Sequence, residues 1–126
     1  EFSGCRLTKE CINNILVNYI TYEPNGFFII QMYGEKGDKN VYVQGSRIAD
    51  NSFHFEAVSQ VYSDDVTPEV ISSIVKLGWN LPYDSNFTQT VYYDQILNKE
   101  AANLLYQTLE SYKLEYDVIT DYVIAR

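Results

Sequence analysis

The chain has 126 residues, 46% of them apolar, and a formal net charge of −8 from 17 acidic and 9 basic residues. This length suits a single domain spanning residues 1–126, large enough to bury about two thirds of its unfolded surface. The acidic balance argues against nucleic-acid phosphate and against an anionic membrane as partners, because both need a basic surface.

The N-terminal part of the chain predicts a helix followed by a strand. Thr8 is a suitable N-cap for a helix that runs to about Tyr19, with apolar residues at helical spacing. The Pro-Asn-Gly segment at residues 24–26 is a turn signal. Residues 27–33 then read as a strand, and their nearly continuous apolarity predicts a central position with both faces at least partly covered.

Two further strands are predicted after a polar hairpin loop at residues 34–40. Residues 41–44 form the second strand, and residues 45–51, which begin with a glycine, are predicted to turn. Residues 52–58 alternate between apolar and polar side chains, which is typical of a half-buried third strand.

The segment from Thr67 to Trp79 carries the clearest helix signals of the chain. Thr67 is a good N-cap, and Pro68 suits the first helical position. After Leu77, Gly78 can adopt the left-handed conformation that closes a helix. Trp79 then either folds back into the core or anchors a partner at the surface, and the closure at Gly78 favours the core.

The remaining elements are a strand, a helix and a tail. Residues 87–93 alternate as a fourth strand, and Asn98 is a suitable cap for a third helix over residues 99–112. The pattern in residues 113–126 leaves open whether this tail is an edge strand or a short docked segment. The predicted order is α-β-β-β-α-β-α, an antiparallel meander with helices packed on it, which is typical of an α+β domain.

The two cysteines, Cys5 and Cys11, are too few for a disulfide framework. They could pair only if Cys5 folds back onto the start of the first helix; otherwise Cys11 is a small apolar core residue. No apolar run approaches the roughly 20 residues of a transmembrane helix, and no leader-like pattern opens the chain, in which residues 1–4 could be a cloning remnant. We therefore expect a cytoplasmic protein and interpret the glycosylation triplet at residues 86–88 as a chance match.

Several short motifs follow one another in the order found in a known family. They lie within about residues 53–110, and each motif alone is common in unrelated proteins. The motifs are Glu56-Ala57-Val58-Ser59, Thr67-Pro68-Glu69, Leu77-Gly78-Trp79, Pro82, Asn86-Phe87 and the Ala- and Leu-rich segment 101–109. In this order and spacing the chain resembles the YbjN-like, or TY-Chap, branch of the type III secretion chaperone superfamily. The first 50 residues agree with that branch in predicted element order.

The resemblance implies a type III secretion chaperone-like fold and a non-enzymatic role. Proteins of this branch bind peptides or partner proteins on sheet and helix surfaces, often as homodimers, and the resemblance defines no ligand. The long, Tyr-rich tail after Tyr112 departs from the family pattern. The chain is therefore expected to act as a chaperone-like or adaptor domain for another protein or a peptide segment.

Aromatic residues suggest where such a segment would bind. They make up 15% of the chain and include 12 Tyr, a residue that suits both binding surfaces and half-buried strands. We predict a binding set on the meander, although strand parity leaves open which members face outward. The set is Phe28, Ile30, Tyr33, Tyr42 and Tyr92.

The single histidine, His54, would have to anchor any histidine-based triad or metal cluster, with Cys5 or Cys11 as the nucleophile. Strand alternation places His54 opposite its two Phe neighbours, toward solvent or a helix rim. We therefore predict that the domain is not an enzyme and has no catalytic residue, metal or cofactor. An alternative hypothesis is an acidic immunity or antitoxin-like inhibitor, because electrostatic steering speeds the association of an acidic domain with a basic partner protein.

Overall fold

The computed structural model describes residues 5–33, 40–64, 66–82, 85–114, 118–119 and 121–126. Most of the predicted hairpin loop, the segment 115–117 of the tail and residues 1–4 lie outside this description. The elements are β1 (Cys5–Arg6), α1 (Lys9–Tyr22), β2 (Phe27–Tyr33), β3 (Asn40–Ala49), β4 (Ser52–Ala57), α2 (Pro68–Lys76), β5 (Phe87–Tyr92), α3 (Tyr93–Leu97), α4 (Glu100–Ser111), β6 (Val118–Ile119) and β7 (Asp121–Ala125).

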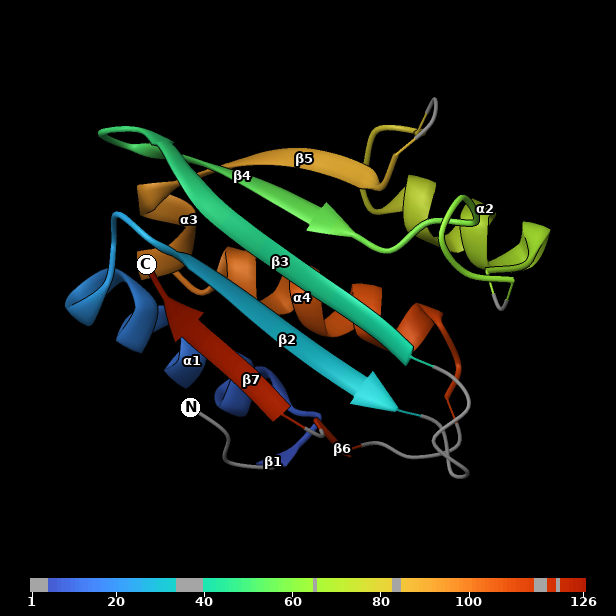
Figure 1. Cartoon of the computed structure of the whole chain (residues 1–126), viewed down its shortest axis with the longest axis horizontal. Coiled ribbons are helices and arrows are strands. Elements are labelled where there is room, and N and C mark those ends of the chain that lie inside the picture. The colour runs from blue at the N-terminus through green and yellow to red at the C-terminus, as the bar shows by residue number, and fades with distance from the viewer. Residues whose placement is uncertain (1–4, 34–39, 65, 83–84, 115–117, 120) are drawn as a thin grey trace.

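Five of the described strands form an antiparallel sheet in the order β5-β4-β3-β2-β7. Helices α1, α3 and α4 lie behind this sheet in Figure 1, and α2 lies beyond the ends of β4 and β5. No described helix crosses the front of the sheet, so the described part of the domain has two layers. The α+β class is as predicted, and the observed order adds β1, α3, β6 and β7 to the predicted elements.

Burial alternates along the strands, because one face of the sheet packs against helices and the other does not. Along β2, Phe28, Ile30 and Met32 are buried, and the residues between them are half-buried. The same period of two recurs in β4 and in the first part of β3. The prediction of a central strand with both faces at least partly covered is confirmed. β2 lies between β3 and β7; helices cover one of its faces, and the other carries half-buried side chains with no described helix over them.

β3 continues to residue 49, so most of the turn predicted at residues 45–51 is wrong. Gly45 pairs with Phe28 on one side and with Phe55 on the other. A Cβ atom at Gly45 would lie 2.6 Å from the Phe28 ring and 2.7 Å from the Phe55 ring, much closer than a normal carbon contact. Glycine is needed at this position because the two rings meet edge to face with their centroids 5.2 Å apart.

α2 has the expected ends. Thr67 Oγ1 accepts a hydrogen bond from the Val70 amide at 3.4 Å, and Pro68 lies in the first turn. Leu77 occupies the C-cap position, and Gly78 follows with a φ of +100°, a backbone conformation that glycine tolerates best. Local signals in the sequence therefore account for both ends of this helix.

Trp79 follows α2 in the chain, and its side chain lies in the core. Trp79 is 2% exposed, and its indole Nε1 donates to Thr108 Oγ1 in α4 at 2.8 Å. Thr108 Oγ1 in turn donates to the Leu104 carbonyl at 2.7 Å, so both buried polar groups are satisfied. Trp79 is a core residue, and it is not available as a surface anchor.

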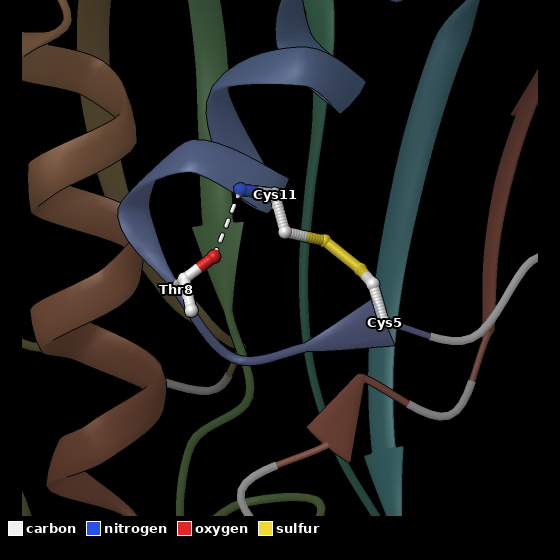
Figure 2. The surroundings of a disulfide bond; sticks show 3 residues. All are labelled: Cys5, Thr8 and Cys11. Carbon is white, nitrogen blue, oxygen red and sulfur yellow. Dashed lines mark hydrogen bonds between the residues drawn. A yellow bond between two sulfur atoms is a disulfide. The ribbon is translucent and has the colours of Figure 1, made fainter.

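A disulfide joins Cys5 in β1 to Cys11 in the first turn of α1, with their Cα atoms 6.6 Å apart. Figure 2 shows this bond beside the start of α1, where Thr8 Oγ1 accepts a hydrogen bond from the Cys11 amide at 3.0 Å. The structure thus contains the pairing that the sequence left open. Cys11 is half-buried and bonded, and its alternative assignment as a free core residue is wrong.

The tail forms two short strands. β6 pairs with β1, so Cys5 lies opposite Ile119, and β7 pairs with β2, so Phe28 lies opposite Ile124. β7 is an edge strand of the sheet, which resolves the two alternatives for this segment. No described helix is long and apolar enough to cross a membrane.

The cap predicted for the last helix is displaced by one residue. Lys99 occupies the N-cap position of α4 with a φ of +71°, and it makes no side-chain cap hydrogen bond. Asn98 still contributes, because its Oδ1 accepts a hydrogen bond from the Glu100 amide at 3.0 Å. The connection from β5 to α4 contains the short helix α3, which was not predicted.

Candidate functional site

The sheet face that no described helix covers is here called the open face. Strand register and alternation assign its residues, because directly opposite partners in an antiparallel pair point to the same face. They include Phe27, Ile29, Gln31 and Tyr33 of β2, Tyr42, Gln44 and Ser46 of β3, His54 and Glu56 of β4, Thr88, Thr90 and Tyr92 of β5, and Val123 of β7.

A polar network centred on Glu56 lies on the β3–β4 part of the open face. Glu56 Oε1 accepts hydrogen bonds from Gln44 Nε2 at 3.0 Å and from Asn86 Nδ2 at 3.1 Å. His54 Nε2 lies 3.1 Å from Glu56 Oε2, two residues along the same strand. Side chains from β3, from β4 itself and from the segment before β5 therefore hold the two carboxylate oxygens.

Asn86 supports this network from the loop before β5. It is only 6% exposed, and its Nδ2 also lies 3.1 Å from the Tyr42 hydroxyl oxygen, to which it donates. The loop itself is held near the end of β4, because Ser59 Oγ donates to the Ser85 carbonyl at 2.6 Å. Two motif segments that are distant in the sequence, residues 56–59 and 86–87, thus meet at one site.

The carboxyl group of Glu56 is ionised at neutral pH. Its partial burial acts to raise the pKa, but hydrogen bonds from Asn86, Gln44 and His54, together with the charge of His54, lower the pKa below its ordinary value of 4.5. The Glu56 side chain is 29% exposed, so solvent and a ligand can still reach it. The open face therefore carries a fixed negative charge.

A hollow of about 210 Å³ lies beside this charge. Phe28 lines the hollow with its backbone, because its side chain is buried on the helix-covered face, and Gly45 has no side chain. The side chains that line it come from Phe27, Ile29, Gln44, Ser46, His54 and Glu56. The hollow thus combines apolar residues of β2 with hydrogen-bonding and charged residues of β3 and β4.

The predicted binding set is divided between the two faces of the sheet. Phe28 and Ile30 are 0% exposed and pack in the core, so their assignment to a contact surface is corrected. Parity explains the difference, because both residues alternate with the half-buried side chains of β2. Tyr33 and Tyr42 are half-buried on the open face, and Tyr92 is 55% exposed there.

His54 lies on the open face with a side-chain exposure of 37%, on the side that strand alternation predicted. Both cysteines considered as nucleophiles are joined in the disulfide. In the described ranges, no group of three or more His, Cys, Asp or Glu side chains could hold a metal ion. The His54–Glu56 pair is part of the polar network on the open face.

Sequence reasoning missed most of the residues that shape this site. Gln44 was placed at the end of a shorter strand, and Asn86 was noticed as part of a motif and a glycosylation triplet. The available signal was the alternation of residues 52–58, which puts His54 and Glu56 on one face. Their convergence with Asn86 depends on the pairing of β4 with β5, which the sequence pattern did not specify.

Comparison of the chain with protein-family models, with curated proteins and with solved structures finds no match. The resemblance to YbjN-like chaperones and the assignment of a chaperone-like fold therefore stay predictions. The geometry of the open face carries the functional argument that follows.

Proposed function

We propose that this domain is a non-enzymatic, chaperone-like or adaptor module that binds a segment of another protein on its open face. The observation that carries this proposal is the one-sided covering of the sheet. Helices α1, α3 and α4 cover one face, whereas the opposite face presents Phe27, Ile29 and several Tyr side chains beside a fixed polar network.

The composition of the open face favours a protein segment as the ligand. Protein interfaces combine aromatic and apolar contacts with about one hydrogen bond for every 100–200 Å². Tyr33, Tyr42 and Tyr92 provide amphipathic contact area, and Gln44 and Thr90 provide hydrogen-bonding groups between them. An open sheet face of this kind suits an extended or shallow partner surface better than an enclosed small molecule.

The test is to select binding peptides and locate where they bind. Short random peptides displayed on phage are selected on the folded protein, and the best binders are titrated into isotopically labelled protein while amide resonances are followed by NMR. We expect shifts in β2, β3 and β4 on the open face. Phe27→Ala and Tyr92→Ala should weaken binding, because each removes an open-face aromatic side chain.

Tyr22→Ala is the matched control, because Tyr22 is a 74% exposed aromatic residue at the end of α1, a helix on the covered side of the sheet. It should leave peptide affinity unchanged. Peptides that shift only the helices, or that bind equally to the open-face variants, would refute the proposal.

The second candidate function is inhibition of a basic protein. The net charge of −8 and the ionised Glu56 favour it, since complementary charge raises association rates. Once a partner is identified, the salt dependence of the association rate separates the two functions. A steep fall in this rate with added salt supports the inhibitor, and a flat response supports capture through apolar contacts.

A further inference from the structure

The hollow on the open face is too small for a cofactor or a drug-sized ligand. Its volume is about 210 Å³, whereas pockets for such ligands usually span about 300–1,000 Å³. This volume matches a single amino-acid side chain that projects from a bound segment. The chemistry of the lining residues then decides which side chain fits.

The charge at one end of the hollow points to a cation. Glu56 Oε1 accepts hydrogen bonds from two side-chain amides, whereas Oε2 lies 3.1 Å from His54 Nε2. An ionised carboxylate oxygen has more than one acceptor position, so Oε2 can take a further donor. The negative charge of the whole chain adds a favourable long-range field for a basic ligand.

The opposite side of the hollow is apolar. Phe27 and Ile29 line it, and both are half-buried on the open face. Lysine and arginine side chains have apolar stems that pack on such surfaces while their charged ends reach a polar group.

We propose that this hollow receives one basic side chain, a lysine or an arginine, from the segment that binds the open face. The stem lies against Phe27 and Ile29, and the charged end binds Glu56. This inference rests on the proposed function, because it assigns the specificity of the same surface.

The test uses three small probes with the wild-type protein and amide resonances as the readout. N-acetylarginine amide and N-acetyllysine amide carry the charge, and N-acetylcitrulline amide has nearly the shape of the arginine probe without it. We expect the two basic probes to shift the resonances around Gly45 and Glu56. The citrulline probe should leave them in place, and equal shifts from all three probes would overturn the proposal.

Protein variants provide the second arm. Glu56→Gln replaces the carboxylate by an uncharged amide of nearly the same shape. It should weaken binding of the arginine probe about two- to fivefold, the range for a partly exposed ion pair. Glu69→Gln changes the net charge equally from an exposed position in α2, and it should leave the affinity unchanged. Equal weakening by both variants would assign the effect to overall charge and refute the site.

The selected peptides separate this inference from the proposed function. Peptides that bind the open face and share one basic residue, with that preference lost on Glu56→Gln, support both. Open-face binders without any basic preference would refute the lysine or arginine specificity and leave the proposed function standing. If Glu56→Gln failed to fold, the comparison of arginine with citrulline probes on the wild-type protein would still decide the matter.

Discussion

Glu56 is a partly exposed carboxyl group whose ionised form is stabilised by folding. Its pKa lies below the ordinary value because the hydrogen bonds and the nearby imidazole outweigh the effect of burial. A carboxyl group with a depressed pKa in the folded state contributes stability above its unfolded pKa, and this contribution is lost as the pH falls through the folded pKa. The free energy of unfolding should therefore depend on Glu56 in the acid range.

We predict that Glu56→Gln reduces the loss of stability between about pH 6 and about pH 3, because the variant has no carboxyl group to protonate at this position. Urea denaturation of both proteins across this range measures the difference. The same comparison in a His54→Gln background should give a smaller effect of the same sign, since Asn86 and Gln44 still stabilise the carboxylate. Identical acid dependence of the paired proteins would contradict the prediction.

Gly78 and Gly45 are required for different physical reasons. Gly78 has a φ of +100°, and a Cβ atom there would find its nearest neighbour, Gln89, at an ordinary 3.6 Å. Its constraint is therefore the backbone conformation. Gly45 is constrained by space, because a Cβ atom there would overlap the rings of Phe28 and Phe55.

We predict that Gly78→Ala lowers the free energy of unfolding by about 1–2 kcal/mol, the usual cost of a side chain in the left-handed region. Gly78→Asn should cost less than Gly78→Ala, because Asn adopts positive φ more readily, and Gly78→Val should cost more. Chemical denaturation of the three variants tests this order. A smaller loss for Val than for Asn would show that the backbone is not the limiting factor.

At the scale of elements, the disulfide constrains more of the chain than the segment from Cys5 to Cys11 that it closes into a loop. Cys5 lies in β1, β1 pairs with β6, and β6 precedes the edge strand β7. The bond therefore anchors the strand that holds β6 in place. Loss of the disulfide should therefore destabilise β6 and β7, near the C-terminus, as well as α1.

We predict that Cys5→Ser with Cys11→Ser lowers the free energy of unfolding by roughly 2 kcal/mol, as expected for a short cross-linked loop. Hydrogen exchange measured by mass spectrometry should accelerate first in β1, β6 and β7. Thr8→Ala is the comparison variant, because it removes the N-cap of α1 and leaves the disulfide. If both changes affected only α1, the link between the disulfide and the edge strand would be refuted.

Elements with strong local signals could be predicted from the sequence. The Thr67 cap, Pro68 and Gly78 define α2, and residues 27–33 were correctly recognised as a strand. The turn predicted at Gly45 failed because the reason for this glycine lies in two rings from neighbouring strands. The sequence pattern around Gly45 does not show that Phe28 and Phe55 lie beside it in the fold.

The candidate site was harder to predict, because it too depends on contacts between residues that are distant in the sequence. Alternation placed His54 correctly. In β2 it did not show which of the two faces packs on helices, so the predicted binding set combined Phe28 and Ile30 of the buried face with residues of the open face. The bonds from Asn86 to Glu56 and Tyr42 join residues 30 and 44 positions apart. Such contacts follow from strand pairing, which local patterns do not determine.

At the scale of the whole molecule, the two-layer architecture predicts opposite outcomes for adjacent residues. Phe28 is fully buried between the sheet and the helices, and its ring contacts those of Tyr19 and Phe55. Phe27 is half-buried on the open face. One chemical change at the two positions therefore tests which face of the sheet carries the stability of the fold.

We predict that Phe28→Ala lowers the free energy of unfolding by about 3–5 kcal/mol, the usual cost of deleting a buried aromatic ring. Phe27→Ala should cost much less and should instead weaken peptide binding. Thermal unfolding monitored by circular dichroism gives the first comparison, and peptide titration gives the second. Equal destabilisation by the two changes would indicate that both faces of the sheet are packed.

Because Asn86 is buried, N-glycosylation at this residue is favoured before the domain folds. Asn86 begins the triplet Asn86-Phe87-Thr88, in which a sugar would be joined to the side-chain nitrogen. In the folded protein that nitrogen donates to Glu56 and Tyr42, and the residue is 6% exposed. An enzyme would reach this nitrogen more readily before the segment that carries Asn86 has packed against β3 and β4. A glycan on Asn86 would therefore mark a chain modified ahead of folding, and rapid folding would itself protect the site.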